Sequence, residues 1–250
     1  MTFDPFNDFE TRGYLRNLFG EKDLSIIKRL EHSSFVAGIP GAFKYLGSIK
    51  KLSYRDVLHT HKLLFGDIYP WAGQDRAQIA PEIAVSKGNV LFAHPQDAGS
   101  AVEYALKIGS DKSIMAEKPG EVMGYLAYAH PFLDGNGRTI MVVHTELAQR
   151  SGISVDWAAT RKTEYLTALT KEIEKPGRGL LDTYLKSFIR KAVETDLLVV
   201  HIVGTRGLDG LERTAEENKI FGNVSDPEVQ DNYQKQKLQR RKRRLRQKSD

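Results

Sequence analysis

The stretch "HPFLDGNGRT", residues 130–139, places a histidine, an acid, two glycines around an asparagine, and an arginine within ten positions. The segments on either side, "PGEVMGYLAYA" and "TIMVVHTELAQRSG", both have the apolar pattern of helices. We therefore expect Gly135-Asn136-Gly137 to form the turn that opens the second of two helices.

Such a turn suits an anionic ligand. The first N–H groups of a helix have no acceptor within the helix, its N-terminus is the positive end of a dipole, and glycines let a phosphate approach the backbone. Arg138 lies in the first turn, where a cation is unfavourable unless an anion offsets it. Asp134 would repel a bare phosphate but suits a Mg²⁺ ion that bridges phosphate oxygens. The residues together indicate a site for a metal-bound nucleotide.

His130 ends the preceding helix, four residues before the acid. A histidine with an ordinary pKa of about 6.5 can take a proton from a hydroxyl nucleophile near neutral pH. The alternative is a plain helix end and glycine turn with a surface ion pair between Asp134 and Arg138. The full set of residues within one decapeptide favours the catalytic interpretation.

The rest of the chain predicts an all-α fold. In the segment 53–66, Ser53 and Asp56 have the spacing of a capping box, and apolar residues follow at helical intervals. Similar patterns occur near 24–31, 97–108, 119–129, 137–150, 160–173 and 179–193. One segment differs: "AVSKGNVLFAHP", residues 84–95, predicts a short β-hairpin, here named the flap, that rests on the helical body.

Composition predicts a folded chain with a distinct C-terminal part. Of its 250 residues, 40% are hydrophobic and 28% are charged, as in globular proteins. Turn-forming residues become frequent after about 194. We expect a catalytic domain at 1–193 that includes the N-terminal helices, a small appendage at 194–232, and a disordered basic tail at 233–250.

The positive charge is concentrated in that tail. The net charge is +5, and residues 235–248 hold nine Lys or Arg and no acid, which leaves 5 − 9 = −4 for the remainder. The body therefore needs no polyanionic partner. The tail has three interpretations: a solvated end, a segment that contacts nucleic acid, or a segment that contacts a membrane. The chain has no cysteine, no signal-peptide pattern and no apolar run that could span a bilayer, so we expect a cytoplasmic protein.

The segment "HPFLDGNGR" resembles the signature of the Fic family, written H-P-F-x-[D/E]-G-N-G-R-x-x-R, and matches it completely at 130–138. The resemblance continues in "HKLLFGDIYPWAGQDR", residues 61–76, which is similar to the family's helix and W-A-G turn. It also includes "VSKGNVLFAHP", which is similar to the family's target-docking hairpin, and covers roughly residues 5–190. The resemblance implies a Fic-like helical bundle.

The resemblance further implies a protein adenylyltransferase that uses ATP as substrate together with Mg²⁺. His130 would be the general base toward a Ser, Thr or Tyr hydroxyl of a target protein, and Asp134 would hold the Mg²⁺. Gly135, Asn136 and Gly137 would form the anion hole, Arg138 would hold the distal phosphates, and Phe132 would fix the loop in the core. AMP would pass to the hydroxyl, with release of pyrophosphate.

Two further groups of residues belong to the expected site. The flap would pair backbone to backbone with an extended target segment. Its candidate residues, Lys87, Gly88, Asn89 and Val90, are also expected to contribute to nucleotide binding. Tyr165 is a candidate for the adenine side of the pocket. His61, by contrast, is expected to be a core or surface histidine, because no metal-ligand partner accompanies it.

Two departures from the family pattern affect these expectations. The family's second arginine falls at Met141, so help with the γ-phosphate is missing. The family's inhibitory motif, [S/T]-x-x-x-E-[G/N], is absent; the nearest string, "SSFVAG" at 33–38, has Ala37 in the glutamate position. A separate antitoxin would therefore have to act by another route.

Other functions remain open at this stage. A kinase like the related Doc proteins is one, although those proteins have lysine where this chain has Gly137. A decayed active site in a binding protein, marked by Met141, is another. Some Fic proteins are toxins or effectors exported by type IV secretion with positively charged C-terminal ends, so contact of the tail with secretion machinery and export as an effector are also expected candidates.

Overall fold

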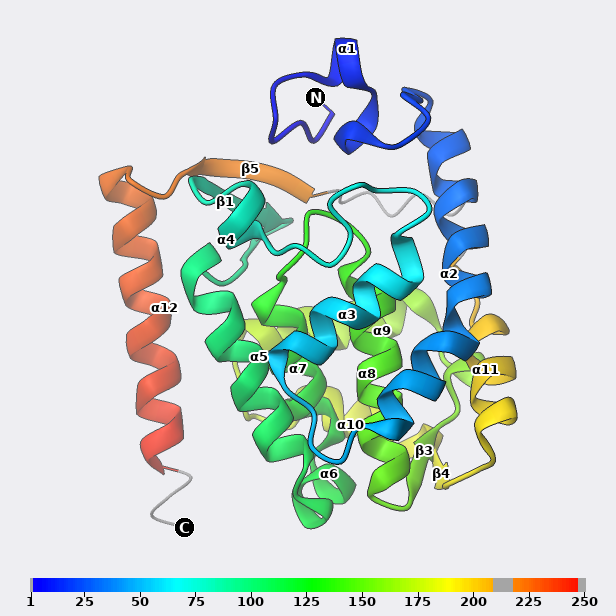
Figure 1. Cartoon of the computed structure of the whole chain (residues 1–250). Helices are drawn as coiled ribbons and strands as arrows, with labels where there is room; N and C mark the ends of the chain where they lie inside the picture. Colours follow the sequence, from blue (N-terminus) through cyan, green and yellow to red (C-terminus); the bar gives the residue numbers. More distant parts are fainter. Residues whose placement is uncertain (1, 209–217, 247–250) are drawn as a thin grey trace.

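The computed structural model describes residues 2–208 and 218–246, with side chains through Arg241 (Figure 1). The chain is mainly helical with only small antiparallel sheets, which confirms the expected fold class. Its helices are α1 (Phe9–Arg12), α2 (Leu24–Ser48), α3 (Tyr54–Phe65), α4 (Arg76–Ile79), α5 (Pro95–Gly109), α6 (Lys112–Glu117), α7 (Pro119–Ala129), α8 (Asn136–Arg150), α9 (Lys162–Glu174), α10 (Leu180–Leu185), α11 (Thr195–Val203) and α12 (Pro227–Arg246), with 3₁₀ turns η1 (Tyr14–Arg16), η2 (Trp157–Ala159) and η3 (Lys186–Phe188). Its strands are β1 (Ile83–Lys87), β2 (Val90–Leu91), β3 (Ile153–Val155), β4 (Ile189–Lys191) and β5 (Asn218–Asn223).

Helix α7 is the centre of the fold. Every residue from Pro119 to Ala129 is buried, as expected for a helix that is apolar on all sides. It packs against α5, α8, α9 and α10. The signature loop, residues 130–135, leaves the end of α7 and leads directly into α8, so the site lies at the end of the two most enclosed helices.

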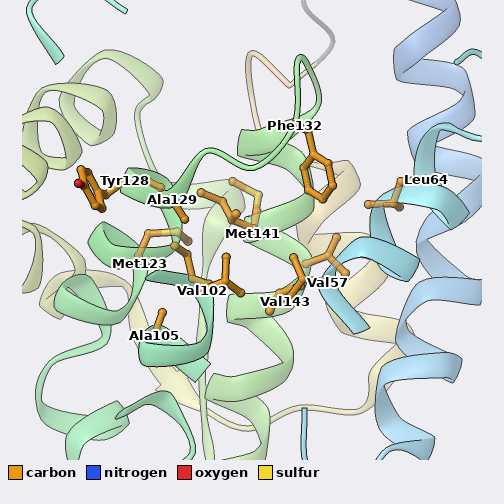
Figure 2. Close-up of a cluster of buried hydrophobic side chains, with 14 of the residues drawn as sticks. Val57, Leu64, Val102, Ala105, Met123, Tyr128, Ala129, Phe132, Met141 and Val143 are labelled. Carbon is orange, nitrogen blue, oxygen red and sulfur yellow. The ribbon is translucent and has the colours of Figure 1, made fainter. Parts of the chain in front are cut away.

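Helices α2 and α3 cover the other side of α8. Asp23 caps α2, since its side chain accepts the N–H of Ser25 at 2.7 Å. At the start of α3 the Ser53 N–H donates to Asp56 Oδ2 at 2.8 Å, and the expected capping box is present. Figure 2 shows Phe132 of the signature loop and Met141 of α8 among the buried side chains of this core.

The expected flap is a hairpin in the structure, and it belongs to a larger sheet. Strands β1 and β2 pair antiparallel around Gly88, whose φ of +56° suits a glycine. Strand β5 pairs antiparallel with the other edge of β1, which gives the order β2-β1-β5. Strand β5 was not expected from the sequence. A strand from the C-terminal part of the chain therefore completes the sheet of the flap.

The expectation of a disordered tail from residue 233 is wrong for the residues that the structure describes. Helix α12 continues to Arg246 and runs along the outside of the molecule beside α5 (Figure 1). Val229, Tyr233 and Arg240 are buried at helical spacing, and Gln236 between them donates to the Leu91 carbonyl oxygen at 2.9 Å. Charge density suggested disorder, but these four positions form one stripe that packs on the body.

The boundary expected at 193 does not separate two cores. Leu198 and Ile202 of α11 are buried within the main hydrophobic core, and α11 packs against α2. Parts of the expected appendage and tail, residues 209–217 and 247–250, lie outside the described residues. In the described part of the chain, no helix combines the length and the apolar character needed to cross a bilayer.

Candidate active site

A cavity of about 380 Å³ opens where the signature loop meets α8. Its walls come from α2, α8, α9, the end of β1 and the segment 205–208. The expected site residues that line it are His130, Asp134, Gly135, Asn136, Gly137, Arg138, Lys87 and Tyr165. The flap residues Gly88, Asn89 and Val90 do not line the cavity. Their positions therefore do not support the expected contact with a nucleotide.

Asn136, the first residue of α8, holds the signature loop in place. The Asn136 side chain accepts the N–H of Phe132 at 2.9 Å and donates to the Phe132 carbonyl oxygen at 2.7 Å. The Phe132 ring is fully buried, in the position expected for a residue that fixes the loop in the core. The Asn136 side chain is thus held within the loop, and its backbone N–H, at the start of α8, is the donor that we expect to face an anion.

Gly135 and Gly137, on either side of Asn136, are glycine for different physical reasons. Gly135 has φ +74°, and a Cβ atom there would lie 2.6 Å from the Phe65 ring, so the fold itself requires glycine. At Gly137, a Cβ would meet no atom within 4 Å. The lack of a side chain at Gly137 is thus not needed for packing, and it leaves room for a ligand at the start of α8.

His130 faces the cavity as a neutral base. Its backbone is left-handed, with φ 41° and ψ 57°, and its ring stacks on Phe92 at 3.6 Å between centroids. Its Nε2 atom is buried and has no hydrogen-bond partner among the residues that the structure describes. Burial lowers the pKa of His130 well below 6.5, and the charges of Arg76 and Lys87 act in the same direction. The imidazole is therefore unprotonated near neutral pH.

Arg76 holds this loop against the base of the flap. Its Nε–H donates to the His130 carbonyl oxygen at 2.7 Å, and a terminal N–H donates to the Ala93 carbonyl oxygen at 2.8 Å. Its backbone N–H donates to the Pro131 carbonyl oxygen at 2.7 Å. The guanidinium is fully buried, and this burial lowers the pKa of Arg76 to about 10. Arg76 ends the segment 61–76 that resembles the family, yet its role was not predicted.

His61 supports the loop from below. Its Nδ1 accepts the N–H of Gly73 at 3.0 Å, so Nε2 carries the proton and donates to the Asp134 carbonyl oxygen at 3.1 Å. Its ring stacks on Phe132 at 3.7 Å between centroids. Burial lowers the pKa of His61 to about 3, so it stays neutral. It is a core histidine, as expected, but one that positions the site.

Asp134 lies among cations and donors. Its Oδ2 accepts from Lys28 Nζ at 2.6 Å and from the Tyr14 hydroxyl at 3.0 Å, and its Oδ1 accepts the N–H of Gly135 at 2.6 Å. Burial alone would raise the pKa of Asp134, but Lys28 and Arg138 hold it far below its usual range. Asp134 is therefore an anion, and its side chain is still 18% exposed.

Arg138 is paired with a buried acid of α2. Its terminal N–H donates to Glu31 Oε2 at 2.6 Å, and its guanidinium lies over the Phe65 ring at 4.7 Å. The Glu31 side chain has 0% exposure, and it also accepts from the Tyr69 hydroxyl and from Lys28. Burial would lower the pKa of Arg138, but Glu31 and Asp134 raise it. No local motif links Glu31 or Lys28 to residues about a hundred positions away, so the sequence did not indicate them.

These residues fit the ligands that the sequence predicts. The N–H groups of Asn136, Gly137 and Arg138 are the first three of α8, which have no acceptor within a helix. Asp134 is a single, partly exposed carboxylate, and Mg²⁺ is commonly held by one or two carboxylates plus substrate phosphates. Asp134 is therefore the residue that would hold a Mg²⁺ ion.

The edge of the flap is occupied by the chain itself. Strand β5 pairs with β1 from Ile83 to Lys87, and the Asn218 side chain donates to the Leu133 carbonyl oxygen at 3.1 Å. Asn218, which opposes Lys87, also lines the cavity. An extended target segment that pairs with this edge of β1 must therefore take the place of β5.

Comparisons with known proteins agree with this architecture. A model of the Fic/DOC family matches residues 51–148. The protein adenylyltransferase VbhT of Bartonella schoenbuchensis is 34% identical over 181 residues, 66% of this chain and 35% of VbhT. The probable protein adenylyltransferase y4lH of Sinorhizobium fredii is 29% identical over 134 residues, 50% of this chain and 66% of that protein. The chain thus spans about a third of VbhT and just under two thirds of y4lH.

The solved structures show the same fold. The BepC protein of Bartonella tribocorum, a VirB-translocated effector solved with bound AMPPNP, is similar with a TM-score of 0.58. The similarity covers 71% of this chain and 92% of that chain, at 19% sequence identity. At this identity the comparison establishes the architecture of the helices around the cavity.

Proposed function

The chain carries a Fic/DOC family domain over residues 51–148, and from this premise we propose that it is a protein adenylyltransferase. It transfers AMP from Mg-ATP to a Ser, Thr or Tyr hydroxyl of a target protein. The protein names of the two relatives support this reaction. The positions of the residues in the cavity support the roles proposed for them below.

The reaction needs a base that is unprotonated before the hydroxyl arrives. His130 meets this need, because burial lowers its pKa and its Nε2 has no partner in the described part of the chain. Nε2 takes the hydroxyl proton as the oxygen attacks the α-phosphorus. A bond forms between that oxygen and the α-phosphorus, the bond from the α-phosphorus to the bridging oxygen breaks, and pyrophosphate leaves with the bonding electrons.

The phosphates lie at the start of α8 in this proposal. The free N–H groups of Asn136, Gly137 and Arg138 stabilise the negative charge on the phosphate oxygens, and Gly137 leaves the space to approach them. Asp134 would hold a Mg²⁺ ion, which would neutralise phosphate charge. Tyr165, whose ring lies edge to face with Trp157 at 5.6 Å, is at the adenine side.

The target segment pairs with the flap. Backbone pairing at β1 positions the hydroxyl without selecting much sequence. Because β5 now fills this edge, docking requires the exchange of β5 for the target segment. None of the residues of strand β5 is buried, and Ile220 and Phe221 in its middle are 44% exposed each, so few buried side-chain contacts oppose its release.

One observation carries the proposal: His130, whose Nε2 has no partner within the described residues, and the N-terminus of α8 line one cavity. The test uses a cell lysate with ATP labelled at the α-phosphate or at the γ-phosphate. We expect the α-label on protein with the wild-type chain and its loss in His130→Ala. The matched control is His59→Ala, since His59 is an exposed histidine of α3 that does not line the cavity.

The two labels separate the proposed reaction from its rivals. Transfer of the γ-label alone would show phosphoryl transfer, as in a kinase. Transfer of neither label, together with normal folding by circular dichroism, would contradict an enzymatic role. Equal loss in His130→Ala and His59→Ala would remove the histidine from the mechanism.

A further inference from the structure

Four charged side chains form one contact network in the cavity. Lys28 Nζ lies 2.6 Å from Asp134 Oδ2 and 3.1 Å from both oxygens of Glu31, and Arg138 lies 2.6 Å from Glu31. Two cations and two anions balance in this network. Glu31 therefore holds part of the charge of Arg138, the cation that the resemblance assigns to the distal phosphates.

A nucleoside triphosphate needs more positive charge than Arg138 alone supplies in this arrangement. The family pattern has a second arginine three residues further along α8, and this chain has Met141 there. Met141 borders the cavity with an uncharged side chain that is 4% exposed. A second cation must then come from another element.

Lys28 has the position and the reach for this role. It lies in the first turns of α2, on the side of the cavity that faces α8, and its side chain is 27% exposed. Its ammonium lies within 3.1 Å of two carboxylates, those of Asp134 and Glu31. Its flexible four-carbon stem lets the ammonium move to a new acceptor. When Asp134 holds a divalent cation, Lys28 loses one of its two carboxylate partners and keeps Glu31, so its ammonium has donors left for phosphate oxygens.

We propose that Lys28 binds the β- and γ-phosphates of ATP and replaces the family's missing second arginine. This inference rests on the proposed function, because it concerns the same nucleotide. It assigns a binding role to a residue outside the family motif, about a hundred positions before it in the sequence. The specific consequence is that Lys28 discriminates by phosphate number.

The test measures binding without turnover. Isothermal titration with a non-hydrolysable ATP analogue, ADP and AMP, each with Mg²⁺, is compared for wild type, Lys28→Met, Lys28→Arg and Lys22→Met. Lys22 is a matched control, because it is an exposed lysine six residues earlier that pairs with Glu10 outside the cavity. We expect Lys28→Met to bind the ATP analogue roughly tenfold more weakly, the loss of one charge-assisted hydrogen bond.

AMP binding identifies the role. AMP lacks the β- and γ-phosphates, so its affinity for Lys28→Met should equal that for wild type, and Lys28→Arg should regain most of the ATP affinity. Equal weakening for AMP and the ATP analogue would show that Lys28 only supports the fold of the cavity and would overturn the inference. Unchanged ATP affinity in Lys28→Met would overturn it as well. A wild-type chain that binds no adenine nucleotide would instead contradict the proposed function itself.

Discussion

Replacement of Glu31 by glutamine tests the charge balance of the cavity most directly. Glu31 has no exposed surface and accepts hydrogen bonds from Arg138, Lys28 and the Tyr69 hydroxyl. Glutamine keeps one acceptor oxygen but removes the negative charge and turns an NH₂ group toward donors. Two cations then face only one anion, Asp134, in a buried site.

The expected loss of stability follows from this uncompensated charge. Removal of one partner from a buried ion pair costs about 3–5 kcal/mol of unfolding free energy. For a chain of this size, a loss of about 3 kcal/mol lowers Tm by roughly 6–12 °C. ATP brings negative charge to the same place, so we expect Glu31→Gln to bind it about tenfold more tightly, which is an additional stabilisation of about 1.4 kcal/mol at saturating ATP.

Thermal unfolding with and without Mg-ATP measures both effects. Glu31→Gln should have a lower Tm than wild type in buffer and a larger rise in Tm when ATP is added. Glu10→Gln is the control, because Glu10 is 83% exposed and pairs with Lys22 on the surface. A destabilised variant with the same ATP-dependent rise as wild type would refute the idea that Glu31 competes with phosphate for Arg138.

Three further predictions concern other parts of the site. Because the pKa of His130 lies well below 6.5 and the unprotonated ring is the base, the rate of α-label transfer should stay flat between about pH 6 and pH 8; a fall to half near pH 6.5 would contradict this. Gly135→Ala should lower Tm, because a positive φ costs about 1–3 kcal/mol for residues other than glycine. Gly137→Ala should keep the Tm of the wild type but weaken ATP binding. Similar Tm losses in both variants would be inconsistent with the two glycine environments. Ser86→Cys and Lys219→Cys together place two cysteines at opposed positions of β1 and β5 in a chain without other cysteines. A disulfide between them would keep β5 on β1, so oxidation should abolish target labelling and reduction should restore it. Full labelling in the disulfide form would exclude docking at this edge.

The parts of the site that the sequence predicts are those encoded locally. The helices around the signature loop follow from apolar periodicity, and the turn at Gly135 follows from the need for positive φ. Long-range contacts carry no such local pattern. The pairing of Glu31 with Arg138 joins positions 107 residues apart, and only the packing of α2 against α8 brings them together.

The C-terminal part of the chain shows the same limit. The run of Lys and Arg after 234 dominates its composition, and three buried positions of one helix face decide its structure instead. Strand β5 has only six residues, and its pairing with β1 depends on a partner more than a hundred positions away. Sequence patterns describe an amphipathic face or a turn, but they do not specify which distant segment covers it.

The guanidinium of Arg76 has a mechanical consequence. Its N–H groups donate to the carbonyl oxygen of His130, the proposed base, and to that of Ala93 at the end of the hairpin, while the Phe92 ring next to Ala93 stacks on the imidazole. The hairpin and the imidazole are thus connected through the Arg76 guanidinium and the ring stack. If the proposed function holds, we expect a partner that displaces the hairpin to reorient the His130 ring as well, and so to slow AMP transfer even after it has bound.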